Sequence, residues 1–66
     1  MQPGDAIDET GTLIRDGGAF WLRRDAGGRF RLDLRRTPID EVEKRVRIIG
    51  IYAGSDLVDV DGVALL

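Results

Sequence analysis

The sequence predicts an all-β fold in which five short strands close into a small barrel, with one short helix between the third and fourth strands. Three observations predict it. Apolar and polar residues alternate with period two in several stretches, glycine-containing turns separate these stretches, and one stretch changes to a helical period. A chain of 66 residues has room for one domain with one core. We therefore take residues 1–66 as a single domain, of which residues 1–8 are expected to be flexible.

The first strand is expected around Gly11, in the stretch TGTLIR at residues 10–15. A glycine inside a strand marks a bulge or a bend, so this strand could take part in two sheets. The acid and the glycines of RDGG, residues 15–18, predict a turn after it.

A hairpin follows the first strand. Residues 19–24 (AFWLRR) and 29–34 (RFRLDL) each alternate apolar and polar side chains, which is typical of half-buried strands. Between them, DAGG at residues 25–28 supplies an acid and two glycines, and these residues tolerate the positive φ angles of a short connection. Four side chains are expected to point outward from this hairpin: Trp21, Arg23, Arg29 and Arg31.

The period changes at residues 37–44, TPIDEVEK, where a helix of one or two turns is expected. Thr37 is a suitable cap and Pro38 suits the first helical position. Acidic residues follow at the positive end of the helix, and apolar residues at helical spacing give it one apolar face.

Two more strands are expected, at residues 45–53 (RVRIIGIYA, with Gly50 as a bulge) and 56–65 (DLVDVDGVAL), joined by a turn at residues 53–56. The alternation predicts that the following residues are buried: Phe20, Leu22, Phe30, Leu32, Val46, Ile48, Val58 and Val60. It predicts that four charged residues are exposed: Arg29, Arg31, Asp59 and Asp61.

Five strands with a helix between the third and fourth form the layout of the OB fold, a small Greek-key barrel that binds ligands on the face of its second and third strands. An SH3-like barrel of the same size is the alternative, since it also has five strands. Such a barrel usually carries only a 3₁₀ turn late in the chain. The position of residues 37–44 therefore favours the OB-like barrel.

Gly11 and Leu13, followed by the motifs GGAFWLR, GGRFRLDL, KRVRIIG and LVDVDGV, form a pattern that covers most of the chain. This pattern resembles a group of small, uncharacterised bacterial OB-like domains, of the kind classed as domains of unknown function. The motifs consist of core alternation and turn glycines. The resemblance therefore implies the fold, and it carries over no catalytic or ligand-binding residue.

The composition excludes several classes of function. The chain has no cysteine and no histidine, so it lacks disulfides, thiolate metal sites and the commonest general base. Its only serine, Ser55, has no base beside it in the sequence. A calcium loop aligned on Asp59 and Asp61 would need an acid where Leu57 stands. We expect no enzymatic activity, no metal site and no cofactor.

The first ten residues contain neither the basic nor the apolar region of a secretory signal, and no apolar run approaches the roughly 18 to 20 residues that span a bilayer. We expect a cytoplasmic protein with no membrane contact. Charge is unevenly distributed. Residues 15–47 contain all ten basic residues and carry +4, whereas residues 1–14 and 48–66 carry −3 each. A polyanion is therefore an acceptable partner despite the net charge of −2.

Trp21, Arg23, Arg29 and Arg31 are the candidate binding residues. Binders of single-stranded nucleic acid stack bases on aromatic side chains and hold phosphates with Lys and Arg. A structural interpretation competes, in which arginine stems cover a tryptophan packed across the hairpin. We hypothesise a non-enzymatic module that binds single-stranded nucleic acid or another polyanion weakly. The alternative is a protein-interaction or self-assembling module that uses the same face or the fourth strand, because Trp and Arg are enriched at interface hot spots.

The predicted strand at residues 45–53 is apolar on both sides from Ile48 to Tyr52, which is unusual for a half-exposed antiparallel strand. Either the helix and residues 62–66 cover the second side, or another subunit does. We expect a homodimer or a larger homo-oligomer through this strand or the last one.

Overall fold

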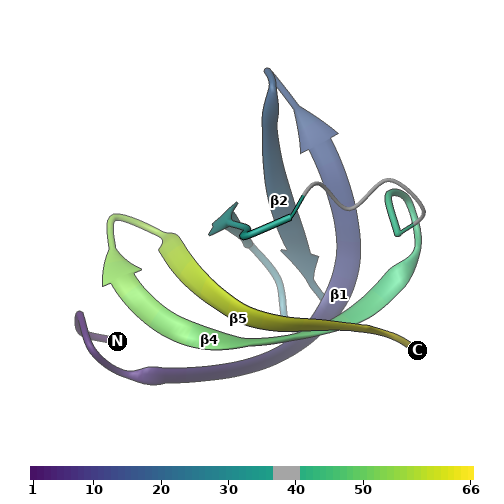
Figure 1. Ribbon diagram of the computed structural model, residues 1–66. Helices are drawn as coiled ribbons and strands as arrows, with labels where there is room; N and C mark the ends of the chain where they lie inside the picture. Colours follow the sequence, from purple (N-terminus) through teal and green to yellow (C-terminus); the bar gives the residue numbers. More distant parts are fainter. Residues whose placement is uncertain (37–40) are drawn as a thin grey trace.

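The computed structural model describes residues 1–36 and 41–66, and within them the chain forms five strands (Figure 1). The strands are β1 (Ala6–Asp16), β2 (Ala19–Arg24), β3 (Arg29–Asp33), β4 (Arg45–Gly54) and β5 (Leu57–Leu65). They close into a barrel in the order β1-β2-β3-β5-β4, in which β4 pairs back with β1. The predicted all-β, five-stranded barrel is confirmed.

The order of the strands makes the barrel a Greek key. β4, β1, β2 and β3 lie side by side and antiparallel, and β5 fills the gap between β3 and β4. β5 runs parallel to β3 and antiparallel to β4. This OB-like arrangement leaves the outer face of β2 and β3 together on one side of the barrel.

β1 is shared between two partners, as the sequence predicts. Its first part pairs with β4 and its second part pairs with β2, and both ladders meet around Gly11. A Cβ atom built on Gly11 would overlap the carbonyl oxygen of Arg23, so the close approach of β2 requires glycine here. Residues 6–8 belong to the segment that was expected to be flexible. In the structure they pair with β4 at the start of β1.

Nine apolar residues of the described chain form the buried core: Ile7, Leu13, Leu22, Phe30, Leu32, Val46, Ile48, Val58 and Val60. Seven of the eight predicted core residues are among them, and the eighth, Phe20, is half-buried and packs against the core. The four charged residues expected to be exposed are exposed. Period two in the strands therefore identified both faces of the sheet correctly.

The predicted helix is wrong in the part that the structure describes. Residues 41–44 form a turn and a bend, and residues 37–40 lie outside the described residues. Glu43 has a positive φ of 67°, and the backbone groups of Glu43 and Lys44 bond to Leu13 of β1. Among residues 41–44 one bond runs along the chain, from the N–H of Lys44 to the carbonyl oxygen of Glu41, and it spans three residues where an α-helical bond spans four. Within residues 1–36 and 41–66, no helix is long and apolar enough to cross a membrane.

The predicted bulge in β4 is confirmed. The register between β4 and β5 shifts between Ile49 and Gly50. A Cβ atom on Gly50 would overlap the carbonyl oxygen of Asp59, so the two strands approach closely at this point. The bulge bends β4 around the core, and this bend helps to close the barrel.

Candidate functional site

The hairpin of β2 and β3 brings the four predicted binding residues together on the outer face of the barrel. In the register, Trp21 lies opposite Arg31 and Arg23 lies opposite Arg29. The residues that alternate with them, Leu22 on β2 and its partner Phe30 on β3, point into the core. We call the surface formed by Trp21, Arg23, Arg29 and Arg31 the hairpin face.

Trp21 is half-buried and is covered by an arginine. The guanidinium carbon of Arg29 lies 4.0 Å from the centre of the indole ring, within the range of a cation–π contact. Nη1 of Arg29 also lies 3.2 Å from Oδ2 of Asp16. The indole Nε1 donates a hydrogen bond of 3.2 Å to the backbone oxygen of Asp16. Asp16 therefore holds both members of the stack.

The position of Asp16 follows from the turn between β1 and β2. Gly17 and Gly18 both have positive φ, 61° and 78°, which is the conformation of a two-residue type I′ hairpin turn. The turn pairs Asp16 with Ala19, two residues before Trp21. Sequence reasoning predicted this turn and missed the role of Asp16, although the register of a two-residue hairpin places that residue beside Trp21.

Arg23 and Arg31 differ from Arg29 in their partners. Both are exposed, and neither takes part in an ion pair among the described residues. Two residues after Arg31, on the same exposed side of β3, is Asp33, which lies opposite Asp59 of β5. The surface is therefore basic over the hairpin face and becomes acidic over β5.

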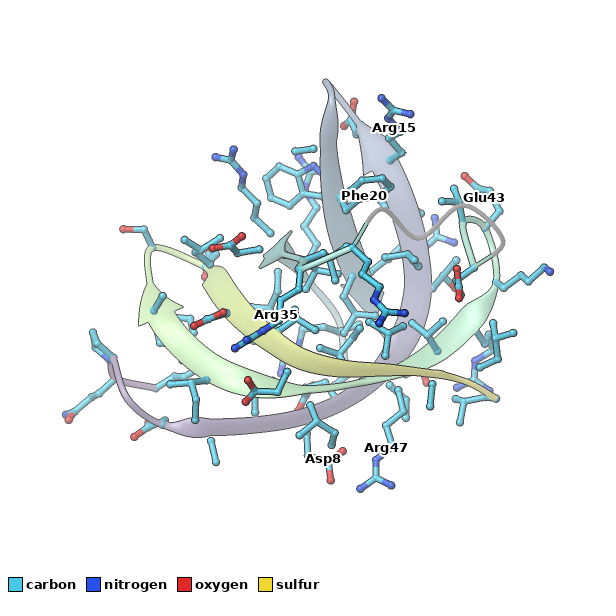
Figure 2. All side chains as sticks on the ribbon, viewed as in Figure 1. Asp8, Arg15, Phe20, Arg35, Glu43 and Arg47 are labelled. Carbon is cyan, nitrogen blue, oxygen red and sulfur yellow. The ribbon has the colours of Figure 1, made fainter. Side chains whose placement is uncertain are left out.

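Away from the hairpin face, four of the seven basic side chains that the structure describes are paired with acids, and Arg15, Arg36 and Lys44 are not. Arg47 forms two hydrogen bonds to Asp8, of 2.8 and 2.6 Å, and the two side chains extend together from the barrel in Figure 2. The hydrogen bond from Arg47 holds the pKa of Asp8 below its ordinary value, against a smaller opposing effect of desolvation. Three further ion pairs lie outside the face: Arg24–Glu9, Arg35–Asp61 and Arg45–Asp25.

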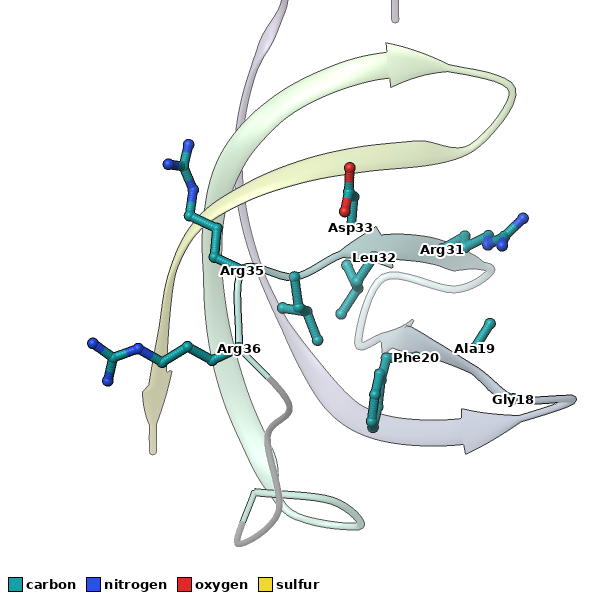
Figure 3. Close-up of a pocket in the computed structure, with 9 residues that line it drawn as sticks. Gly18, Ala19, Phe20, Arg31, Leu32, Asp33, Arg35 and Arg36 are labelled. Atoms are coloured by element: carbon teal, nitrogen blue, oxygen red, sulfur yellow. The ribbon is translucent and has the colours of Figure 1, made fainter.

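A hollow of about 280 Å³ adjoins the hairpin face at Arg31 (Figure 3). It opens beyond Phe20 and Leu32, the last residues of the β2–β3 register at that end. In Figure 3, the side chains of Arg35 and Arg36 extend away from it. The lining of the hollow combines four charged residues, Arg31, Asp33, Arg35 and Arg36, with the apolar Phe20 and Leu32.

The outer side of β4 carries exposed apolar residues. Ile49 and Ile51 have 39% and 40% of their surface exposed, whereas Ile48 on the inner side is fully buried. These two side chains are therefore partly covered by the described residues and partly open to solvent. The strand that is apolar on both sides in the sequence, β4, therefore has one side in the core and the other side partly exposed.

The part of the chain that the structure describes brings together no group of three acidic residues that could hold a metal ion. Ser55 lies in the turn between β4 and β5, where it has a positive φ of 52°. This position agrees with its interpretation as a turn residue.

A family model described as a protein of unknown function, DUF5818, matches residues 10–66. No curated protein and no solved structure matches the chain.

Proposed function

The chain belongs to the DUF5818 family of proteins of unknown function, and we propose that it is a non-enzymatic module that binds single-stranded nucleic acid on its hairpin face. The absence of cysteine and histidine from the sequence supports a binding role over a catalytic one.

The observation that carries this proposal is the grouping of one aromatic residue and three arginines on a single exposed surface. Trp21 and Arg31 are cross-strand neighbours, and Arg23 lies two residues along β2. Proteins that bind single strands combine a basic track for phosphates with planar groups on which bases stack. The hairpin face supplies both kinds of group on a surface about two strands wide.

The structural interpretation explains only part of this arrangement. It accounts for Arg29, whose guanidinium covers the indole and is neutralised by Asp16. It does not account for Arg23 and Arg31, which carry no carboxylate partner among the described residues. An unneutralised pair of guanidinium groups beside the stack favours an anionic partner.

The proposal is tested by titrating the protein with a short oligonucleotide at low salt while recording the emission of Trp21, the only tryptophan. Binding should change that emission, and Trp21→Ala should weaken binding by about 1 to 3 kcal/mol. Arg23→Ala and Arg31→Ala should each flatten the slope of log affinity against log salt by somewhat less than one unit.

Lys44→Ala is the matched control, because it also removes one positive charge from an exposed residue. Lys44 precedes β4, and its backbone bonds to the side of β1 that faces away from β2. The salt slope of this variant should equal that of the wild type. Unchanged emission at low salt, where attraction to phosphates is strongest, would rule out nucleic-acid binding by this face.

A protein-interaction module is the second candidate, and the exposed outer side of β4 favours it. Ile49 and Ile51 lie side by side across from Asp8 and Ala6 of β1. Apolar side chains at the centre of a patch with charged neighbours are typical of contact surfaces between proteins. A second copy of the chain is the partner that we expect there.

A further inference from the structure

We propose that the nucleic-acid base stacks on the guanidinium of Arg29, so that the hairpin face selects strands with unpaired bases over other polyanions. This inference rests on the proposed function and assigns different tasks to the three arginines. Arg29 is the stacking platform, and Arg23 and Arg31 contact phosphates.

The contacts of Arg29 distinguish it from its neighbours. The indole of Trp21 lies under its guanidinium at 4.0 Å, and the carboxylate of Asp16 lies 3.2 Å from Nη1. Its side chain nevertheless keeps 47% of its surface exposed. One side of the planar group is therefore supported by an aromatic ring, and much of the rest is open to a ligand.

Asp16 orients the support because it contacts both Arg29 and the tryptophan. Its backbone oxygen accepts the indole N–H at 3.2 Å while its side chain binds Arg29. A guanidinium that is already held in place loses little conformational freedom when a base stacks on it. A base on Arg29 would complete a three-layer stack of indole, guanidinium and base, and proteins that bind single-stranded RNA use arginine planes in this way.

The same contacts make Arg29 a poor phosphate ligand. Its charge is already matched by the carboxylate of Asp16, so a phosphate would have to compete with that ion pair. Arg23 and Arg31 have no such competitor among the described residues. On this face, Arg29 therefore offers a planar group supported by the indole, and Arg23 and Arg31 offer the positive charges that no described carboxylate neutralises.

The test compares Arg29→Lys with Arg23→Lys. Each variant keeps its positive charge and loses the guanidinium plane. On oligothymidylate, Arg29→Lys should weaken binding by at least about fivefold, as expected for the loss of one stacked base, and Arg23→Lys should weaken it by less than about twofold. Both variants should keep the wild-type salt slope, because the charge is unchanged.

An abasic strand of the same length gives the second arm. Without bases there is nothing to stack, so the wild type should bind it more weakly than oligothymidylate, and Arg29→Lys should bind it as well as the wild type does. Circular dichroism of each variant checks that the barrel is intact. Arg29→Gln, which keeps a planar group without the charge, replaces Arg29→Lys if the latter does not fold, and it should retain more base-dependent affinity than Arg29→Ala.

Equal losses for Arg29→Lys and Arg23→Lys, or equal wild-type affinity for the abasic and base-containing strands, would overturn the platform and leave the proposed function standing. A wild type that binds neither strand at low salt would overturn both proposals. The two failures are therefore distinguishable.

Discussion

At the scale of single residues, the outer surface of the barrel contains two kinds of arginine. Some are neutralised by a nearby carboxylate, as Arg47 is by Asp8 and Arg29 is by Asp16. Others, such as Arg23, have no acidic partner among the described residues. In the proposed function, the unpaired Arg23 and Arg31 contact phosphates, and the neutralised Arg29 supplies the stacking surface.

The neutralised pairs predict how stability depends on pH. Hydrogen bonds from Arg47 lower the pKa of Asp8, and a hydrogen bond from Thr10, with a further one from Arg45, lowers the pKa of Asp25. A carboxyl whose pKa is lower in the folded state stabilises the fold above its ordinary pKa of 3.8. That contribution is lost as the pH falls below this value.

We therefore expect the free energy of unfolding to decrease as the pH is lowered from 5 to 2 in urea titrations. Asp8→Asn and Asp25→Asn should each make this decrease smaller, because they remove a titrating group. Asp59→Asn is the control, since Asp59 is exposed and has no ion pair among the described residues. A pH profile that neither variant alters would contradict the assignment.

Sequence alone could place the binding residues on one face, because the orientation of neighbouring side chains in a strand is a local property. Period two was enough to point Trp21 and Arg31 outward. It could not show that Arg29 lies over the indole and not beside it, since that contact depends on Asp16 from another strand. The contacts that distinguish Arg29 from Arg23 and Arg31 join side chains of different strands, and the structure was needed to show them.

At the scale of elements, the segment after β3 shows where a local pattern misleads. Residues 37–44 carry a suitable cap and helical spacing, and these signals predict a helix. In the described part, Glu43 and Lys44 instead extend the hydrogen bonding of β1 through Leu13. Pairing with a strand that is distant in the sequence outweighs a weak helical preference in a segment too short to nucleate a helix by itself.

Gly11 allows a direct test of how β1 serves two partners. Gly11→Ala should lower the free energy of unfolding by about 1 to 3 kcal/mol or more, because the added Cβ would overlap the backbone of Arg23 in β2. Gly62→Ala is the matched control in β5, where nothing lies within 4 Å of the added atom. Its effect should stay within about 0.5 kcal/mol. Equal losses for both variants in urea denaturation would show that close packing at Gly11 is not the reason for the glycine.

At the scale of the whole molecule, the ring of strands leaves an apolar region on β4 partly exposed to solvent. Ile49 and Ile51 occupy the outer side of β4, next to the ion pair of Asp8 and Arg47. A 66-residue chain without disulfides gains little stability from its own core, so self-association through this side would add to it.

We expect light scattering to show a mass above 7.3 kDa at micromolar concentration, and Ile51→Lys to return it to the monomer value. Trp21→Ala should leave the mass unchanged if β4 forms the contact. Loss of the oligomer with Trp21→Ala and not with Ile51→Lys would move the interface to the hairpin face. A monomer mass over a wide range of concentration would remove the expectation of a homo-oligomer.

Closure of the barrel also sets the order in which the protein can fold. The pair that closes the ring joins Ala6 to Ile51, so most of the chain must be available before β1 finds β4. Pairings this distant in sequence make folding slow compared with helical proteins of the same size. During synthesis, β1, β2 and β3 are made before β4, and until β4 and β5 follow and pair, their apolar inner side has no second half of the core to cover it. For that interval the nascent chain has a completed hairpin face on one side and unprotected core residues on the other, and it is in this state that we expect the protein to be most prone to aggregation.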